Sequence, residues 1–276
     1  MSIDPKVEKA IKNKLTDLQV FAGIKILYSL ESGSRAWGIE SVDSDYDVRF
    51  IYISGPRHYL ALEDMPDNLR PTNDTEYDLD IHGWDLQKAL RLFRGGNPNL
   101  LEWLESPYCY LEHTDTIDKM RQLVGRHFSK TTSMHHYHSM AVKTFDKYLK
   151  DEQVMMKKYF YVLRPILACE WTRRFGTKPP IEFESLVKYC VDDSQVKIQI
   201  RNLTERKRAG EELGIVDRCE TLHNFIAVKM ESLAFYLRTM PKERYNKAPW
   251  QTLNFIFEDA LKEAWLNSDL IKGGLL

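Results

Sequence analysis

Hydrophobic residues in the first part of the chain recur with two different periods. Period two, in which apolar and polar residues alternate, predicts strands over 24–30, 46–53 and 75–84. Apolar residues spaced three or four apart predict helices over 7–21, over 86–93 after an N-cap at Asp85, and in a short segment ending near 104. Residues 54–74, which contain three prolines, are expected to form a long surface loop.

Helical spacing dominates from about residue 115 onward. It predicts helices over 115–125, 135–150, 152–175, 183–190, 196–213, 216–238 and 251–266. We therefore expect an α+β fold in which a mixed sheet with helices, residues 1–115, precedes an all-helical domain, residues 116–276. A functional site would then lie in the cleft between the two domains.

The bulk composition of the 276 residues excludes several protein classes. The chain contains no run of eighteen apolar residues and no secretory signal at its polar amino terminus, so we expect a protein that does not bind membranes. Its four cysteines are far apart and form no CxxC pair, which favours free thiols in the cytoplasm over structural zinc.

Charge is distributed unevenly although the net charge is only −1. Residues 1–128 carry 15 Lys and Arg against 21 Asp and Glu, whereas residues 129–276 carry 24 against 19. The first part can supply carboxylates to a metal, and the second can supply cations to phosphates or to an RNA backbone. The basic run from Arg201 to Arg208 is either a solvated helix face or such an RNA contact.

Carboxylates cluster at the beginning of the second strand. Asp45 and Asp47 lie on one face because residues two apart in a strand point the same way. Two carboxylates so close repel each other unless a cation lies between them, and Mg²⁺ prefers carboxylate oxygens while it keeps sites for phosphate. Gly33 and Ser34 form a turn shortly before, whose backbone N–H groups and hydroxyl can hold phosphates. Arg35 is a further phosphate ligand or a surface residue.

This ordered set resembles the polymerase-β-type nucleotidyltransferase superfamily. The run Gly33–Gly38 followed by Asp43–Arg49 is similar to one branch of it, the nucleotidyltransferases associated with RNA ligases and RNA repair. Residues 97–104 and 159–165 also resemble that branch, so the similarity spans most of the chain.

The resemblance implies a site and a reaction. A third metal-binding acid is expected between apolar neighbours on the next strand, which selects Asp80 in Leu79-Asp80-Ile81, with Asp78 as the alternative. Asp45, Asp47 and Asp80 would bind Mg²⁺, or alternatively Mn²⁺, and would catalyse transfer of a nucleotide from an NTP such as ATP.

A helix after the catalytic domain contacts the nucleotide in related two-domain enzymes. The resemblance therefore implies nucleotide-binding roles for Lys157, Lys158, Tyr161 and Arg164, of which Lys157, Tyr161 and Arg164 share one helix face. A solvated basic face with aromatic packing is the structural alternative for these residues.

The expected acceptor is a hydroxyl at an RNA end, in the repair of tRNA or another RNA, with an RNA ligase as a further candidate partner. The near-neutral charge also permits nucleotidylation of a protein or small-molecule hydroxyl. A third hypothesis is an RNA-binding regulatory module without catalysis, against which the presence of all three acids argues.

Overall fold

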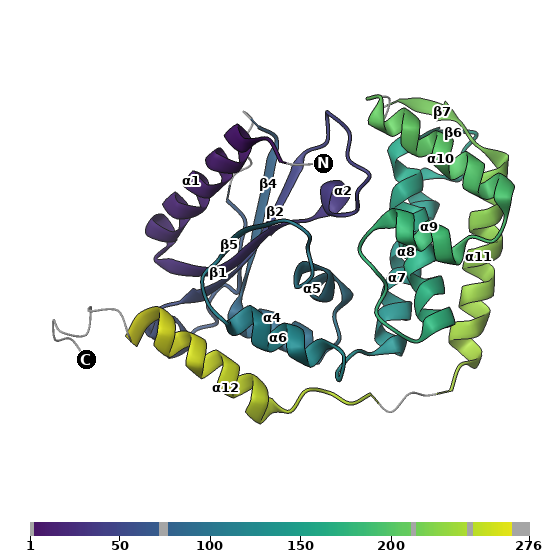
Figure 1. The fold of residues 1–276 in the computed structure, drawn as a ribbon. Coiled ribbons are helices and arrows are strands. Elements are labelled where there is room, and N and C mark those ends of the chain that lie inside the picture. The colour runs from purple at the N-terminus through teal and green to yellow at the C-terminus, as the bar shows by residue number, and fades with distance from the viewer. Residues whose placement is uncertain (1–2, 72–76, 211–213, 242–244, 267–276) are drawn as a thin grey trace. The chain divides into compact units, whose positions relative to one another are not determined.

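The computed structural model describes residues 3–71, 77–210, 214–241 and 245–266 (Figure 1). The chain has a mixed α and β fold, as the sequence predicts, and it divides into two compact units. A sheet unit comprises residues 1–33, 45–127 and 247–276, and a helical unit comprises residues 34–44 and 128–246.

A mixed sheet forms the centre of the sheet unit. Its strand order is β3-β4-β2-β1-β5, and the strands are β1 (Ile24–Glu31), β2 (Tyr46–Ser54), β3 (Asn68–Leu69), β4 (Leu79–Asp85) and β5 (Cys109–Glu112). Strand β2 pairs with β4 in parallel, whereas the other neighbouring pairs are antiparallel. The parallel pairing matters for the site because it places the first residues of β2 and β4 side by side.

Helices cover both faces of this sheet (Figure 1). Helix α1 (Pro5–Ala22) begins after Asp4, whose side chain accepts a hydrogen bond from the backbone N–H of Lys6. Its buried Ile11 and Leu15 belong to the same apolar cluster as Val48 of β2. The sheet unit further contains α3 (Pro56–Tyr59), α4 (Leu86–Arg94), α5 (Pro98–Trp103), α6 (Thr116–Val124), α12 (Trp250–Leu261) and the π-helical turn Lys262–Leu266. The short helix α2 (Gly33–Ala36) spans the boundary between the units.

The C-terminal helix α12 belongs to the sheet unit. Asp259 accepts a hydrogen bond from Lys119 of α6, and the Trp250 ring lies 4.3 Å from the guanidinium carbon of Arg94. The two units are therefore not the expected domains 1–115 and 116–276. Residues 116–127 and α12 belong to the sheet unit. Helical periodicity reports that a helix has an apolar face but not which part of the chain covers it.

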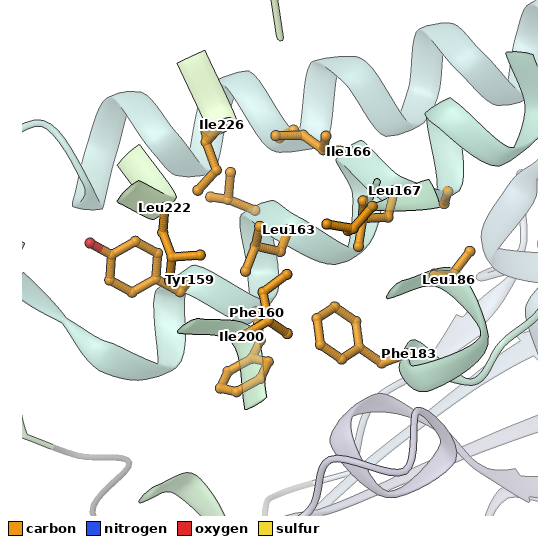
Figure 2. Close-up of a cluster of buried hydrophobic side chains, with 14 of the residues drawn as sticks. Tyr159, Phe160, Leu163, Ile166, Leu167, Phe183, Leu186, Ile200, Leu222 and Ile226 are labelled. Atoms are coloured by element: carbon orange, nitrogen blue, oxygen red, sulfur yellow. The ribbon is translucent and has the colours of Figure 1, made fainter. Parts of the chain in front are cut away.

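The helical unit has one continuous apolar core (Figure 2). Its elements are α7 (Lys130–Tyr148), α8 (Met156–Phe175), α9 (Phe183–Cys190), α10 (Ser194–Arg208), α11 (Glu220–Thr239) and the antiparallel pair of β6 (Gln153–Met155) and β7 (Ile215–Asp217). Helix α8 is buried along most of its length, and its Leu163 and Ile166 lie among side chains from α9, α10 and α11. Burial of so much apolar surface makes α8 a rigid support for its few accessible side chains.

The structure corrects several details of the predicted elements. The segments 153–155 and 215–217 are strands rather than helix starts, because two three-residue strands pair through the backbone and leave no detectable period. The loop 54–74 contains α3 and β3, and β5 also has no clear sequence signal. The third predicted strand begins at Leu79, after a turn at 77–78, while residues 75–76 lie outside the described residues. Within the described ranges, no helix is both long and apolar enough to cross a membrane.

Candidate active site

Asp47 and Asp80 lie side by side at the first ends of two parallel strands. They are direct partners in the register of β2 and β4. Arg49, two residues after Asp47 on the same face, bridges them: its Nη2 donates to Asp47 Oδ1 at 2.7 Å and to Asp80 Oδ2 at 2.8 Å. A second guanidinium, that of Arg70, lies 3.4 Å from Asp80 Oδ1. The strand pairing thus brings together two of the three acids expected from the sequence.

Asp45 belongs to the same electrostatic cluster. The pKa of the Asp47 carboxyl is raised from its ordinary value of 3.8 to about 6: burial is the largest cause, Arg49 opposes it, and the negative charges of Asp45 and Asp80 add to the rise. Asp45 and Asp80 are therefore close enough to repel the Asp47 carboxylate, and Arg49 compensates this carboxylate only in part.

Gly33 lies directly against the Asp47 carboxylate. A Cβ on residue 33 would lie 1.9 Å from Asp47 Oδ2, and the residue has a φ of +60°, which L side chains rarely adopt. The neighbouring Ser32 N–H donates to the Asp47 carbonyl oxygen at 2.9 Å. Only glycine fits between the turn and the carboxylate, which explains why this residue type is needed there.

Glu31 is a buried support of the site that sequence reasoning missed. Its side chain is fully buried at the end of β1; Oε1 accepts the backbone N–H of Asp47 at 3.0 Å, and Oε2 accepts the hydroxyl of Tyr110 at 2.6 Å. The available signal was a glutamate that ends an apolar strand directly before the Gly-Ser turn, a place where a charged residue needs a specific partner.

The structure separates Asp80 from its alternative, Asp78. Asp80 is half-buried on the face of β4 that carries His82, beside Asp47. Asp78 is exposed, has a φ of 51° and lies in the turn before the strand, where its carbonyl oxygen accepts the Tyr46 N–H at 3.1 Å. Burial and the charge of Arg49 lower the pKa of His82, which favours a neutral imidazole beside the acids.

Ser34 and Arg35 fall in the helical unit, one residue beyond Gly33. Ser34 is buried, and its carbonyl oxygen accepts the Ile39 N–H at 3.0 Å. Arg35 Nη2 donates to the Ser44 carbonyl oxygen at 2.6 Å. In this arrangement the Arg35 guanidinium closes the loop 34–44.

The four expected nucleotide-binding residues of α8 differ in exposure. Lys157 is half-buried, and Tyr161 is 39% exposed. The Lys158 ammonium is also half-buried and lies 4.5 Å from the Tyr148 ring centre and 5.1 Å from that of Tyr161. Lys158 and Tyr161 therefore form a cation–π pair in which both side chains are partly accessible.

Arg164, the fourth residue, is almost fully buried. It is only 2% exposed, its guanidinium carbon lies 4.4 Å from the Trp37 ring centre, and its Nη2 donates to the Ile181 carbonyl oxygen at 3.4 Å. The ring centres of Trp37 and Tyr161 lie 5.7 Å apart, with the two rings nearly perpendicular. Arg164 therefore orients Trp37 and Tyr161 within the helical unit rather than presenting its charge to solvent.

The acid cluster has the ligand chemistry of a divalent-cation site. Among the described residues, no group of three or more His, Cys, Asp or Glu side chains is arranged as a ready metal site, and Arg49 bridges two of the candidate ligands. The donors are nevertheless carboxylate oxygens, which hard cations prefer, and the raised pKa of Asp47, caused mainly by burial and in part by Asp45 and Asp80, shows that its ionised form lacks full compensation. The ligand chemistry of these carboxylates thus suits a divalent ion, while Arg49 lies between two of them in this structure.

Comparison with known proteins gives matches over nearly the whole chain. The model of the RNA repair pathway DNA polymerase beta family, RlaP, matches residues 7–259. The uncharacterized protein YcgL of Bacillus subtilis strain 168 is 40% identical over 260 residues, which cover 94% of this chain and 98% of that protein. A crystal structure of a nucleotidyltransferase-like protein from Exiguobacterium sibiricum 255-15 aligns over 94% of this chain and 81% of its own, with a TM-score of 0.33 and 11% identity.

Proposed function

Because the chain belongs to the RNA repair pathway DNA polymerase beta family, we propose that it transfers a nucleoside monophosphate from an NTP to a hydroxyl at an RNA end. In this reaction the acceptor oxygen forms a bond to the α-phosphorus while the bond from that phosphorus to the β-phosphate oxygen breaks, so pyrophosphate leaves. ATP is one candidate donor, and broken tRNA is one candidate acceptor.

Asp45, Asp47 and Asp80 hold the divalent cation in this proposal, with Mg²⁺ first and Mn²⁺ as the alternative. The bound cation would stabilise the charge on the attacking and leaving oxygens and lower the pKa of the acceptor hydroxyl. Glu31 keeps the Asp47 main chain in place through its 3.0 Å hydrogen bond. Arg49 holds Asp47 and Asp80 in a common direction from its position between them.

The phosphates of the NTP are bound at the Gly33–Ser34 turn. Gly33 has no Cβ to separate the turn from the Asp47 carboxylate, so phosphates bound at the turn would lie close to a cation held by that carboxylate. Lys157, Lys158 and Tyr161 serve as further nucleotide contacts, Lys158 and Tyr161 as a cation and stacking pair. Arg164 acts through Trp37 as a positioning residue.

The in-register placement of Asp47 and Asp80 is the observation that carries this proposal. Two carboxylates beside each other, with a third in electrostatic range, oppose folding on balance, since burial and then repulsion raise the pKa of Asp47 in spite of Arg49. In a chain of this family, that arrangement is best explained by binding of a catalytic cation.

Labelled NTPs test the proposal directly. The protein is incubated with NTPs labelled at the α-phosphate, Mg²⁺ and tRNA-like RNA that has been cut, and the label is expected on the RNA but not with Asp47→Asn. Label on a protein or small molecule would instead support the transferase with another acceptor. Absence of any transfer by a protein that still binds divalent ions would favour a non-catalytic RNA-binding module.

The four free cysteines support the cytoplasm as the proposed location, because thiols persist in reducing compartments. An RNA ligase, as a partner that seals the modified end, remains part of the proposal.

A further inference from the structure

A pocket inside the helical unit is lined by α9, α10 and the residues Gly38 and Ile39, and by none of the acids proposed to hold the cation. It has a volume of about 360 Å³, which falls in the usual range for small-ligand sites. Its floor is apolar and well packed: Ile39, Phe183 and Ile200 each line it and are at most 3% exposed. Such a floor can accept a flat, weakly polar group such as a nucleobase.

The rim of the pocket is strongly basic. Lys188 on α9 and Lys197, Arg201 and Arg208 on α10 contribute four cations, against the single acid Glu184. A net positive rim over an apolar floor complements a ligand that is anionic on one side and aromatic on the other.

Two of the rim cations are not used by the fold. Among the described residues, the side chains of Lys197 and Arg201 make no hydrogen bond and no ion pair within 4.0 Å, although the Lys197 charge helps to lower the pKa of Asp192. Arg208, in contrast, is fixed because its Nη2 donates to the Gly38 carbonyl oxygen at 3.2 Å. The fold therefore leaves both side chains available to a ligand without loss of an internal hydrogen bond.

The cations of α10 form a row rather than a point. Lys197, Arg201 and Arg208 lie four and seven residues apart, so they share one helix face and span roughly 16 Å at 1.5 Å per residue. Stacked nucleotides carry one phosphate about every 3.4 Å along a strand. The row therefore matches several consecutive phosphates better than the compact phosphate group of a free nucleotide.

We propose that this pocket binds single-stranded RNA, with one base on the apolar floor and the adjoining phosphates along α10. The inference rests on the proposed function and extends it, since it assigns the acceptor RNA to a site of its own in the helical unit.

RNA affinity measured without NTP tests the charged part of the site. Fluorescence anisotropy of a short labelled single-stranded RNA is recorded for the full-length protein from about 50 to 200 mM salt. The double variant Lys197→Gln plus Arg201→Gln is expected to bind about tenfold more weakly, with a log–log salt slope shallower by about 1.4, because each lost cation removes about 0.7. Lys143→Gln plus Arg238→Gln, exposed on α7 and α11, is the matched control and should stay within about twofold of wild type.

A second variant tests the apolar part. Thr204, which also lines the pocket, is replaced by Leu to fill the cavity without a change in charge. RNA binding should weaken while the salt slope stays the same, because a base is excluded and no phosphate contact is lost. Unfolding midpoints confirm that each variant is folded.

Several results would overturn the inference. It is wrong if wild type binds no RNA, if the pocket variants bind RNA like the control, or if free ATP or AMP competes as tightly as the RNA does. Its failure is distinct from that of the proposed function: label transfer to RNA with unchanged binding in the pocket variants would refute the pocket alone. Weakened binding in those variants without any transfer by wild type would refute the function alone.

Discussion

Replacing Asp47 by Asn should stabilise the folded protein while it abolishes nucleotidyl transfer. The Asp47 carboxyl has a pKa of about 6 in the folded protein against an ordinary 3.8, so its ionisation opposes folding. A tenfold change in proton affinity is worth about 1.4 kcal/mol, and the whole difference therefore corresponds to roughly 3 kcal/mol at neutral pH. The side chain is 17% exposed, so solvent screening reduces this value only modestly.

Because the pKa of Asp47 is raised in the folded protein, the effect of Asp47→Asn on stability depends on pH. Above about pH 6 the carboxylate is charged in both states and the full penalty is present; as the pH falls from 6 to 3.8, the folded protein takes up a proton first and gains stability. Asp47→Asn removes the charge at every pH. We expect it to raise the free energy of unfolding by about 2–3 kcal/mol at pH 7.5 and by roughly half as much at pH 5.

Urea unfolding at pH 7.5 and pH 5 measures the change in the free energy of unfolding. Asp17→Asn, on the exposed face of α1, is the control and should change it by less than about 0.5 kcal/mol. Destabilisation by Asp47→Asn at pH 7.5, or an equal change at both pH values, would refute the reasoning. Either result would mean that Arg49 compensates the carboxylate fully.

Three further predictions follow from individual contacts. Gly38→Ala should lower the free energy of unfolding by about 1–2 kcal/mol through backbone strain alone, because its added Cβ meets nothing within 4 Å. Gly33→Ala should cost clearly more, because its Cβ meets the Asp47 carboxylate. Equal losses in urea unfolding would contradict this close approach. Asp80→Asn should lower single-turnover transfer from labelled NTP by at least about 100-fold while Asp78→Asn stays near wild type, and the reverse order would move the third ligand to the turn. Arg164→Gln should cost about 2 kcal/mol of stability in thermal unfolding because its guanidinium is buried against an indole ring, whereas an unchanged stability with impaired NTP binding would make it a ligand instead.

The sequence alone predicts most of the sheet and helices and the face that carries the acids. Period-two alternation predicts that Asp47 and Asp80 lie on one face of the sheet and that Val48 and Ile81 lie on the other. The structure has this arrangement, with Val48 and Ile81 in the buried apolar cluster. Alternation does not specify strand pairing, however. The parallel register that sets Asp47 opposite Asp80 is visible only in the fold.

Support of the site is harder to predict than the site itself. Glu31 accepts a hydrogen bond from the main chain of Asp47, and Arg49 donates one to Asp80 on another strand. Local sequence patterns do not predict such long-range partners. Arg164 shows the opposite difficulty, since a spacing of three and four residues places it on a face but does not tell whether a ring such as Trp37 covers that face.

The central claim is that Asp45, Asp47 and Asp80 together support transfer of a nucleotide to RNA. Its most direct test compares ATP labelled at the α-phosphate with ATP labelled at the γ-phosphate, each incubated with Mg²⁺, cut RNA and either wild-type protein or Asp47→Asn. We predict that the α-label appears on the RNA and the γ-label in pyrophosphate with wild type, and that neither occurs with the variant. Equal labelling of RNA by both proteins, or γ-label on the RNA, would contradict the account.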